Sequence, residues 1–219
     1  MVVPILTIDG PSGAGKGTVS RLIANKLNWH YLDSGSIYRS LAIAVLKRSI
    51  DLNNQSEIIK TAQVMDLAFE CGEDLIVKLD GEDITAQLGL ETTGNSASII
   101  AAFPDVREVL LKKQRDFKQP PGLVADGRDM GTVVFPEAEI KVFLTASSEK
   151  RANRRYKQLI EKGIDANLTR LITEIEERDR RDMGRTTAPL SMAKGALYID
   201  SSDMTIEAVI QEILNLIHG

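Results

Sequence analysis

The sequence contains few of the residues on which several classes of protein depend. Its 219 residues include one cysteine, two histidines and one tryptophan. The single cysteine, Cys71, excludes an internal disulfide, and no cysteine–histidine cluster has the spacing of a zinc site. Basic residues are outnumbered, because 27 Lys and Arg stand against 31 Asp and Glu, a net charge of −4. This balance argues against broad nucleic-acid binding, and we expect no nucleic-acid partner.

Long hydrophobic runs are missing as well. No apolar stretch reaches the length of a membrane span, and residues 1–4 lack the charged region that opens a secretory signal peptide. We therefore expect a cytoplasmic protein with no membrane partner. Its 43% hydrophobic and 26% charged residues are ordinary for a globular chain, and the length fits one domain with a small insert.

Short apolar runs alternate with amphipathic helical patterns along most of the chain. The runs cover residues 5–8, 30–33, 123–126, 140–144 and 197–200. The helical patterns lie near residues 16–27, 36–48, 104–117, 149–162, 167–183 and 204–217. This alternation predicts an α/β fold with a parallel central sheet covered by helices on both faces. Ligands of such folds gather at the carboxyl ends of the strands.

One segment departs from this alternation. Apolar residues recur at every second position over 67–71 and 75–79, and Asp80-Gly81 then supplies a turn. We predict a small antiparallel meander, set as an insert near residues 60–100. The alternative is an irregular connection.

The most informative motif directly follows the first apolar run, and a helical pattern follows it in turn. Strand, glycine-rich loop and helix in this order are typical of a phosphate-binding loop (P-loop), in which backbone N–H groups and the helix N-terminus face phosphate oxygens. The lysine of such a loop reaches the β- and γ-phosphates. Gly17 stands where a serine or threonine usually provides a hydroxyl to Mg²⁺. The motif reads Gly10-Pro11-Ser12-Gly13-Ala14-Gly15-Lys16-Gly17-Thr18, and the alternative is a plain glycine-rich turn.

Two further clusters follow predicted strands. The first offers a helix N-terminus, hydroxyls and an arginine, which suit a second anionic group; the alternative is an ordinary helix cap with Ser34 as the capping residue. In the second, Asp126 is a candidate for holding hydrated Mg²⁺ and Arg128 can bind phosphate as a fork; the alternative is a glycine-rich turn with a structural salt bridge. The clusters read Asp33-Ser34-Gly35-Ser36-Ile37-Tyr38-Arg39 and Asp126-Gly127-Arg128-Asp129-Met130-Gly131-Thr132.

A third cluster is rich in arginine. If a helix persists there, Arg178, Asp182 and Arg185 share one face. Gly184 is expected to end or loosen this helix, which would leave Arg185 on a mobile segment able to close over phosphates. The alternative is a solvated charged face, and an RNA-binding patch is disfavoured because acidic residues are interleaved and no aromatic residue is near. The cluster holds Arg178, Arg180, Arg181, Asp182 and Arg185, and Arg151, Arg154 and Arg155 of the preceding helix would add positive potential.

Together these features indicate phosphoryl transfer between two bound phosphates. The barrier of that reaction is lowered mainly by positioning and by neutralising charge with Lys, Arg and Mg²⁺. A phosphate acceptor is already deprotonated near neutral pH, so no general base is required. This agrees with the histidines, since His30 begins a strand and His218 lies in the C-terminal tail.

Five motifs resemble those of the nucleoside monophosphate kinase family, and most closely its bacterial cytidylate kinase branch. Those at 33–39 and 126–132 are specific to that branch, whereas the P-loop is shared widely. Gly17 followed by Thr18 is normal in the family. The resemblance covers essentially the whole chain, and its motifs lie at residues 8–18, 32–39, 101–107, 125–132 and 177–182.

The resemblance implies a three-layer P-loop NTPase fold. Residues 1–219 would form one kinase domain, with the NMP-binding insert at about 60–100 and a short helical LID within about 151–186. It implies ATP-dependent phosphorylation of CMP and dCMP to CDP and dCDP by in-line transfer, as part of pyrimidine nucleotide metabolism. Mg²⁺ would accompany ATP, and the enzyme would be a monomer.

The resemblance also assigns roles to residues. Gly10, Pro11, Ser12, Gly13, Ala14, Gly15, Lys16, Gly17 and Thr18 would hold the ATP phosphates. Ser98, Arg107 and Asp129 would read the cytosine edge, whose donor amino group and acceptors an Asp and Arg pair can tell from uracil. The nucleoside, its sugar and its phosphate would contact Ser34, Tyr38, Arg39, Arg128, Arg178, Asp182 and Arg185. The catalytic set would be Lys16, Arg128, Arg178 and Arg181, with Asp126 contacting Mg²⁺ through water.

Two other readings compete with this one. The first is a P-loop kinase for another acceptor, such as UMP, AMP or shikimate. The second is a nucleotide switch that reads guanine through an Asn-Lys-x-Asp signature. Residues 25–28 read Asn-Lys-Leu-Asn, lack that aspartate and fall in the first helix, which disfavours the switch.

Overall fold

The structure is a computed structural model that describes residues 3–71, 75–161 and 163–218. The chain divides into two compact units, and each is described by itself. Unit 1 comprises Met1–Leu32 and Arg115–Gly219, and unit 2 comprises Asp33–Gln114. Among the described residues, no helix has both the length and the apolar character needed to cross a membrane.

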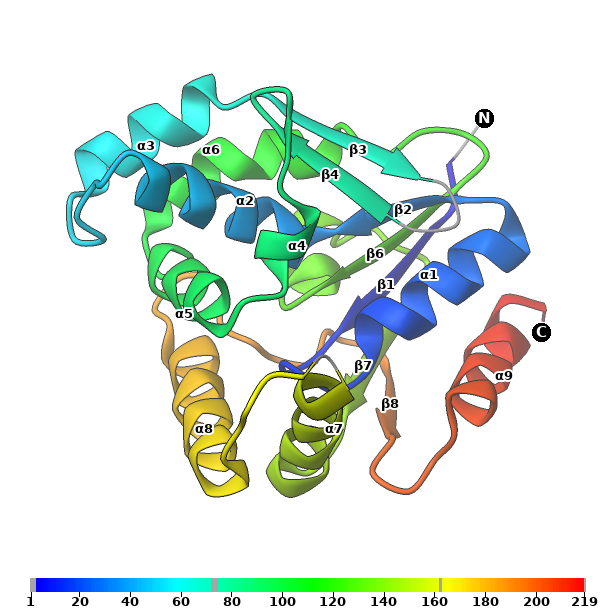
Figure 1. The fold of residues 1–219 in the computed structure, drawn as a ribbon. Coiled ribbons are helices and arrows are strands. Elements are labelled where there is room, and N and C mark those ends of the chain that lie inside the picture. The colour runs from blue at the N-terminus through cyan, green and yellow to red at the C-terminus, as the bar shows by residue number, and fades with distance from the viewer. Residues whose placement is uncertain (1–2, 72–74, 162, 219) are drawn as a thin grey trace. The chain divides into compact units, whose positions relative to one another are not determined.

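A parallel sheet forms the centre of unit 1 (Figure 1). Its middle strand is buried throughout, as expected for an apolar strand with helices near it. Within the described residues the strand order is β2 (His30–Asp33), β6 (Leu123–Gly127), β1 (Ile5–Asp9), β7 (Ile140–Thr145) and β8 (Leu197–Asp200). The pairs β6–β1, β1–β7 and β7–β8 are parallel, which confirms the predicted central sheet.

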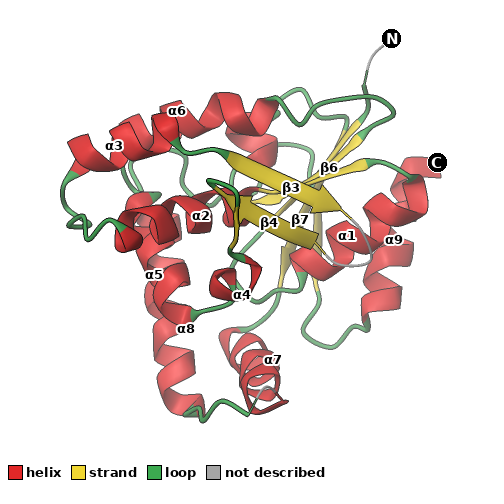
Figure 2. Cartoon of the chain, turned by 45° about the horizontal axis from the view of Figure 1, so that its top comes forward, coloured by secondary structure: helices red, strands yellow, loops and turns green. Residues whose placement is uncertain are grey.

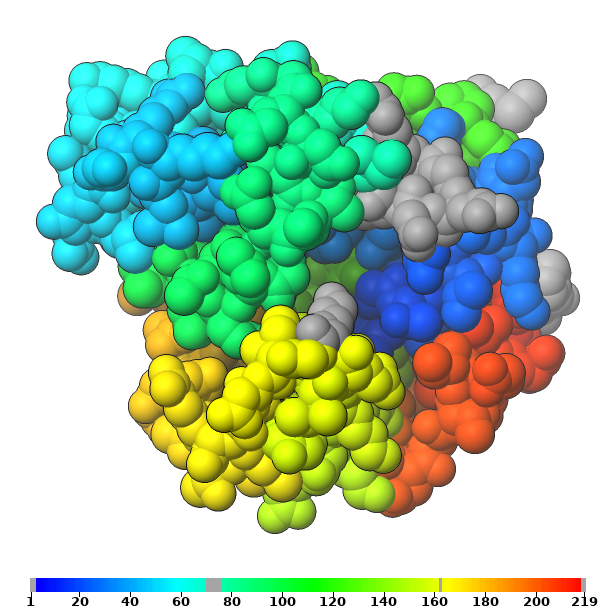
Figure 3. Space-filling model, viewed as in Figure 1, coloured from blue at the N-terminus to red at the C-terminus, as the bar shows by residue number. Residues whose placement is uncertain are grey.

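The helices of unit 1 pack in two groups. The first group, α1 (Lys16–Leu27) and α9 (Ile206–His218), lies against the sheet. Val19 and Ile23 of α1 and Ile213 of α9 pack with Leu6 and Ile8 of β1 in one buried cluster. In the second group, two charged helices pack against each other over a smaller apolar cluster. Their residues, yellow-green and yellow-orange, adjoin at the surface in Figure 3. This second group is α7 (Ser148–Glu161) with α8 (Leu168–Gly184); a short π-helical turn, η1 (Met130–Val134), follows β6.

Unit 2 contains the predicted antiparallel meander. Its described residues form a sheet in the order β3 (Leu67–Cys71), β4 (Leu75–Leu79) and β5 (Glu82–Asp83), with β3 and β4 adjacent in Figure 2. The meander prediction is therefore confirmed, and the irregular connection is excluded. The helices of the unit are α2 (Ser34–Lys47), α3 (Gln55–Val64), α4 (Thr85–Leu88), α5 (Glu91–Ile100) and α6 (Pro104–Arg115), the last ending one residue beyond it.

Unit 2 holds helices that the sequence did not predict. The clearest is α5, whose residues Thr92, Thr93, Gly94, Asn95 and Ser96 have low helix propensity. Burial accounts for the helix, because Thr93, Gly94, Ala97 and Ile100 are buried and α5 packs against α2.

Candidate functional site

The P-loop runs from the end of β1 to the start of α1, as predicted. Gly10 has φ 151°, and a Cβ there would lie 1.9 Å from the carbonyl oxygen of Leu144 in β7. Only glycine fits so close to that backbone. Gly15, also at positive φ, is the N-cap of α1. The loop therefore leaves the sheet tightly beside β7 and delivers a helix N-terminus, which favours anions.

Lys16 begins α1 and lies buried over its own loop. Its Nζ donates to the carbonyl oxygen of Pro11 at 2.9 Å and lies 4.0 Å from Oδ1 of Asp126. Asp126 belongs to β6, where it pairs in register with Ile8 of β1. The Lys16 ammonium therefore lies between the backbone of the P-loop, which follows β1, and the Asp126 carboxylate, near the end of the neighbouring strand β6.

The Asp126 carboxylate also lies beside position 17. A Cβ on Gly17 would lie 3.4 Å from Oδ2 of Asp126 and 3.6 Å from Oη of Tyr31. Tyr31 donates a hydrogen bond to that same Oδ2 at 3.3 Å. The space in which a side chain at position 17 would begin is thus bordered by a carboxylate and the phenol that orients it.

This donor set suits a hydrated Mg²⁺ ion. Mg²⁺ keeps several waters and is usually held by one or two carboxylates together with substrate phosphates. Asp126 supplies one buried carboxylate beside the P-loop. Within the described residues, no group of three or more His, Cys, Asp or Glu could hold a metal by itself. The residues therefore fit an ion that arrives with nucleotide phosphates.

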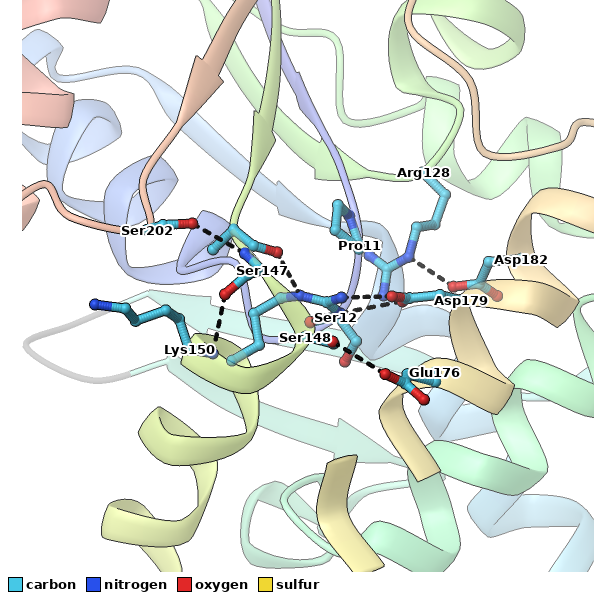
Figure 4. Close-up of polar contacts among 12 residues, drawn as sticks. Pro11, Ser12, Arg128, Ser147, Ser148, Lys150, Glu176, Asp179, Asp182 and Ser202 are labelled. Atoms are coloured by element: carbon cyan, nitrogen blue, oxygen red, sulfur yellow. Dashed lines mark hydrogen bonds and ion pairs between the residues drawn. The ribbon is translucent and has the colours of Figure 1, made fainter. Parts of the chain in front are cut away.

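Arg128 and Asp182, two predicted substrate residues, bind each other. Nε of Arg128 donates to Oδ2 of Asp182 at 2.9 Å (Figure 4). Nη1 of Arg128 donates to the carbonyl oxygen of Gly127 at 3.2 Å. Burial alone would lower the pKa of Arg128, but the charge of Asp182 and its hydrogen bond raise that pKa above its usual value. Burial alone would raise the pKa of Asp182, and Arg128, Arg178 and Arg185 together hold it below its usual value. Both groups are therefore charged at neutral pH.

Asp9 is a residue that the sequence reasoning did not single out. Its Oδ1 accepts the N–H of Met130 and its Oδ2 accepts the N–H of Gly131, each at 2.8 Å. The first two N–H groups of η1 therefore donate to Asp9, and not to the side chain of Asp129, which immediately precedes η1 in the sequence. The sequence signal that could have identified Asp9 is its place as a carboxylate at the end of a largely apolar strand.

The environment of Asp9 is strongly perturbed. Burial raises the pKa of Asp9 to about 7, although the hydrogen bonds from Gly131 and Met130 oppose the rise. The charge of Asp129 raises this pKa further, and the charge of Lys16 lowers it. Asp9 therefore joins the end of the P-loop strand to the motif that contains Arg128 and Asp129 through a carboxylate that titrates near neutrality.

The arginine-rich cluster lies on α8 and just beyond it. The helix ends at Gly184, as predicted, and Arg185 follows as its C-cap. Asp182 and Arg185 are buried, whereas Arg178 and Arg181 are half-buried and Arg180 is exposed. A fully solvated face does not describe this helix, since the predicted substrate residues are on its covered side.

Two arginines of α7 contact the P-loop backbone, where the sequence suggested only added positive potential. Nη1 of Arg151 donates to the carbonyl oxygen of Ser12 at 3.0 Å. Nη1 of Arg154 lies 3.4 Å from the carbonyl oxygen of Ala14. Arg154 also donates to Ser201, just after β8. Both guanidinium groups therefore hold the loop by its carbonyl groups.

The predicted substrate residues of unit 2 lie on α2, α5 and α6. Arg107 places its guanidinium 5.5 Å from the ring centroid of Tyr38, within cation–π range, and donates to the carbonyl oxygen of Ala101 at 3.2 Å. Arg39 donates to the carbonyl oxygen of Leu88 at 2.6 Å. Ser98 is buried on α5. Tyr38 and Arg107 thus form one pair within the unit.

The N-cap of α2 differs from the one that the sequence offered as an alternative, Ser34. Asp33 is the N-cap, and its Oδ1 accepts the N–H of Ser36 at 3.0 Å. Ser34, the alternative cap, instead donates from Oγ to Oε1 of Gln114 at 2.7 Å. The prediction that Ser34 caps the helix is therefore wrong, because the Asp33 carboxylate accepts the N–H of Ser36.

A parallel sheet, a P-loop with a buried lysine, and an Asp-Gly-Arg motif at the end of the neighbouring strand define a P-loop kinase class of fold. Solved structures agree at the level of fold. A gluconokinase from Sinorhizobium meliloti 1021 superposes with a TM-score of 0.51 at 14% identity, covering 99% of this chain and 92% of that chain. An uncharacterized protein from Eubacterium ventriosum gives 0.52 at 15% identity, with 98% of each chain covered.

Sequence relatives define the family within this class. Residues 6–219 match the family model described as cytidylate kinase. A cytidylate kinase of Aeromonas salmonicida is 55% identical, covering 97% of this chain and 93% of the relative. One of Methylococcus capsulatus is 54% identical, covering 99% and 98%. The chain therefore belongs to the cytidylate kinase family of nucleoside monophosphate kinases.

Proposed function

We propose that the protein transfers the γ-phosphoryl group of ATP to CMP or dCMP and so produces ADP with CDP or dCDP. Family membership supports this acceptor, because relatives that are 55% identical over nearly the whole chain are named cytidylate kinases. The structural observation that carries the proposal is Lys16. Its buried ammonium is held on the P-loop 4.0 Å from Asp126, where a nucleotide phosphate would meet both a cation and a carboxylate able to face Mg²⁺.

On the donor side, the chain would work by fixing charge. The P-loop N–H groups and the N-terminus of α1 would bind the ATP phosphates, and Lys16 would neutralise negative charge on the transferred group. Asp126, oriented by Tyr31, would hold Mg²⁺ through water. When bound, Mg²⁺ would neutralise phosphate charge and align the phosphates of ATP.

On the acceptor side, Arg128 is the residue best prepared to receive a phosphate. It already has a carboxylate partner in Asp182, yet only its Nε and Nη1 are used in the contacts described above. A guanidinium carries five donors in a rigid fork, so Arg128 can bind a phosphate while Asp182 keeps it oriented. The half-buried Arg178 and Arg181 would then neutralise charge during transfer.

Recognition of the base would fall to Asp129, Ser98 and Arg107. The cytosine amino group is a donor that suits the Asp129 carboxylate, and the ring nitrogen and carbonyl are acceptors that suit Arg107 and Ser98. Tyr38 supports Arg107 through the cation–π contact. Because the acceptor phosphate is ionised near neutral pH, the reaction needs no general base, and exclusion of water would limit hydrolysis of ATP.

A panel of acceptors tests the proposal. ADP release is measured by a coupled assay with Mg²⁺ and ATP, using CMP, dCMP, UMP, AMP and shikimate as acceptors and GTP as an alternative donor. We expect turnover to be fastest with CMP or dCMP. No ADP release with either of these, together with normal turnover on another acceptor, would overturn the assignment. Light scattering on the same sample tests the expected monomer.

A further inference from the structure

The two aspartates of α8 each bind an arginine from elsewhere in unit 1. Asp182 binds Arg128, and Asp179, one turn earlier, binds Arg151 of α7. In Figure 4 both aspartates project from α8 to the same side, and Asp179 reaches toward Ser12 of the P-loop. The Asp182 pair belongs to the proposed acceptor site. The Asp179 pair has no role in the function proposed so far.

Arg151 donates four hydrogen bonds to three different segments of unit 1. Its Nε donates to the carbonyl oxygen of Ala146 at 2.8 Å, just after β7. Its Nη1 donates both to the carbonyl oxygen of Ser12 at 3.0 Å and to Oδ1 of Asp179 at 3.1 Å, and its Nη2 donates to Oδ2 of Asp179. Arg151 is only 4% exposed. One planar cation therefore joins the sheet, the P-loop and α8.

The loop also rests on the aliphatic part of this side chain. A Cβ on Gly13 would lie 3.2 Å from Cβ of Arg151. Because the guanidinium is rigid and planar, the Ser12 carbonyl and the Asp179 carboxylate hold fixed directions relative to each other. The position of the P-loop at residues 12–13 and the rotation of α8 are thus coupled through one group.

That rotation matters because of what lies next to Asp179. Arg178 precedes it directly, and Arg181 and Asp182 follow within one turn. Stability alone gives little reason for such a pair, since buried ion pairs often contribute little over apolar residues of similar volume. A role in setting the direction of the neighbouring arginines accounts for a buried arginine that binds Asp179 in a bidentate manner and two backbone carbonyls as well.

We propose that Arg151 and Asp179 are positioning residues for phosphoryl transfer: Arg151 holds the P-loop through Ser12, and Asp179 fixes α8 on Arg151 so that Arg178, Arg181 and Asp182 are aligned. The kinetic part of this proposal rests on the proposed function, whereas the part that concerns the P-loop needs ATP binding alone. The two ends of the link therefore have different expected effects.

Two variants separate these ends. In Asp179→Asn, Arg151 keeps its bonds to Ser12 and Ala146, so a non-hydrolysable ATP analogue with Mg²⁺ should bind within about twofold of wild type while kcat falls about tenfold, the scale of a weakened charged hydrogen bond. In Arg151→Lys the fork is lost, so both analogue affinity and kcat should fall about tenfold or more. The double variant should be no worse than Arg151→Lys, because both residues act through one link.

The matched control is Lys150→Gln. Lys150 lies on α7 beside Arg151, and the substitution removes its exposed ion pair with Asp203. It should leave affinity and kcat within about twofold of wild type, as expected of a surface pair. Far-ultraviolet circular dichroism and melting temperatures identify variants that are folded at the assay temperature. If Arg151→Lys does not fold, Arg151→Gln replaces it, because it also removes the fork and should lower both analogue affinity and kcat.

Folded variants with kcat and analogue affinity equal to the control would overturn the proposal and leave the pair a purely structural contact. Equal loss of affinity in Asp179→Asn and Arg151→Lys would also contradict it, since the two ends would then not be separable. Failure of the proposed function has a different signature: wild type binds the ATP analogue but does not phosphorylate CMP. In that case kcat is measured with the acceptor that the panel identifies, and the comparison of variants still holds.

Discussion

The Arg128 guanidinium donates through Nε to the Asp182 carboxylate at 2.9 Å, across 54 residues of sequence. Two residues that the sequence assigned separately to the acceptor are therefore one unit of charge and orientation. The carboxylate fixes the direction of the fork, and the fork keeps the carboxylate ionised. Changes at either residue should consequently affect the acceptor and spare ATP.

Replacing the fork by a point charge tests this directly. We expect Arg128→Lys to lower kcat/KM for CMP at least about tenfold, because an ammonium cannot bind phosphate and Asp182 in two fixed directions. The KM for ATP should change little. Arg170→Lys is the matched control, since Arg170 is an exposed arginine of α8 paired with Glu174. Unchanged kinetics for CMP in Arg128→Lys would contradict the proposed role of the fork.

Removing the carboxylate charge tests the other member of the pair. Asp182→Asn should raise the KM for CMP about tenfold, because Arg128 loses its charged partner and the direction that it sets. Initial-rate measurements with each substrate varied in turn would show this, with Asp203→Asn as a control at an exposed aspartate. A rise in the KM for ATP without a rise in the KM for CMP would mean that Asp182 acts on ATP binding, and would contradict the prediction.

Asp9 gives a prediction about stability and pH. Its pKa in the folded protein is about 7, above the ordinary value of 3.8. A carboxyl group with a raised folded pKa favours folding below the unfolded pKa and loses that contribution as pH rises through the folded pKa. The stability of wild type relative to Asp9→Asn should therefore fall between about pH 4 and pH 7, by on the order of 2–4 kcal/mol.

Urea unfolding of the two proteins at several pH values measures this difference. The slope of the unfolding transition should be the same in both, so that the shift in midpoint reports stability. A stability difference that stays constant from pH 4 to 7 would mean that Asp9 does not titrate in this range.

The contact between Arg107 and Tyr38 leads to a prediction about kinetics with CMP, UMP and ATP. Arg107→Ala removes the guanidinium that stacks on Tyr38, so kcat/KM for CMP should fall about tenfold or more while the KM for ATP stays within about twofold. UMP turnover should change less than CMP turnover, and the ratio of the two is the readout. A uniform loss with CMP, UMP and ATP would indicate a structural role for Arg107 instead.

Much of the fold followed from local pattern. The five predicted runs became the strands of the central sheet. The inner strands β1 and β6 are buried throughout, as expected of parallel strands inside a sheet, whereas β2 and β8 at its edges are partly exposed. The alternation over 67–71 and 75–79 became the β3–β4 hairpin. Helix α5 was missed because Thr, Gly, Asn and Ser disfavour a helix locally, and its burial against α2 is visible only in three dimensions.

The site divides in the same way. Lys16 was predicted from the glycine-rich loop and Asp126 from its place at the end of a strand, and the structure brings them within 4.0 Å of each other. The contacts of Asp9 with Met130 and Gly131 span more than 120 residues and were invisible to any local pattern. The link from Arg151 to Asp179 was hidden for a similar reason, although Asp179 precedes Asp182 by one helical turn.

The central claim is that the P-loop lysine serves the donor half of an ATP-to-CMP transfer. It is tested most directly by measuring CDP formation from CMP with Mg²⁺ and ATP in wild type and in Lys16→Ala, after circular dichroism has shown both to be folded. We expect CDP formation by wild type and a fall of about 100-fold or more in the variant. A near-wild-type rate in folded Lys16→Ala would contradict it.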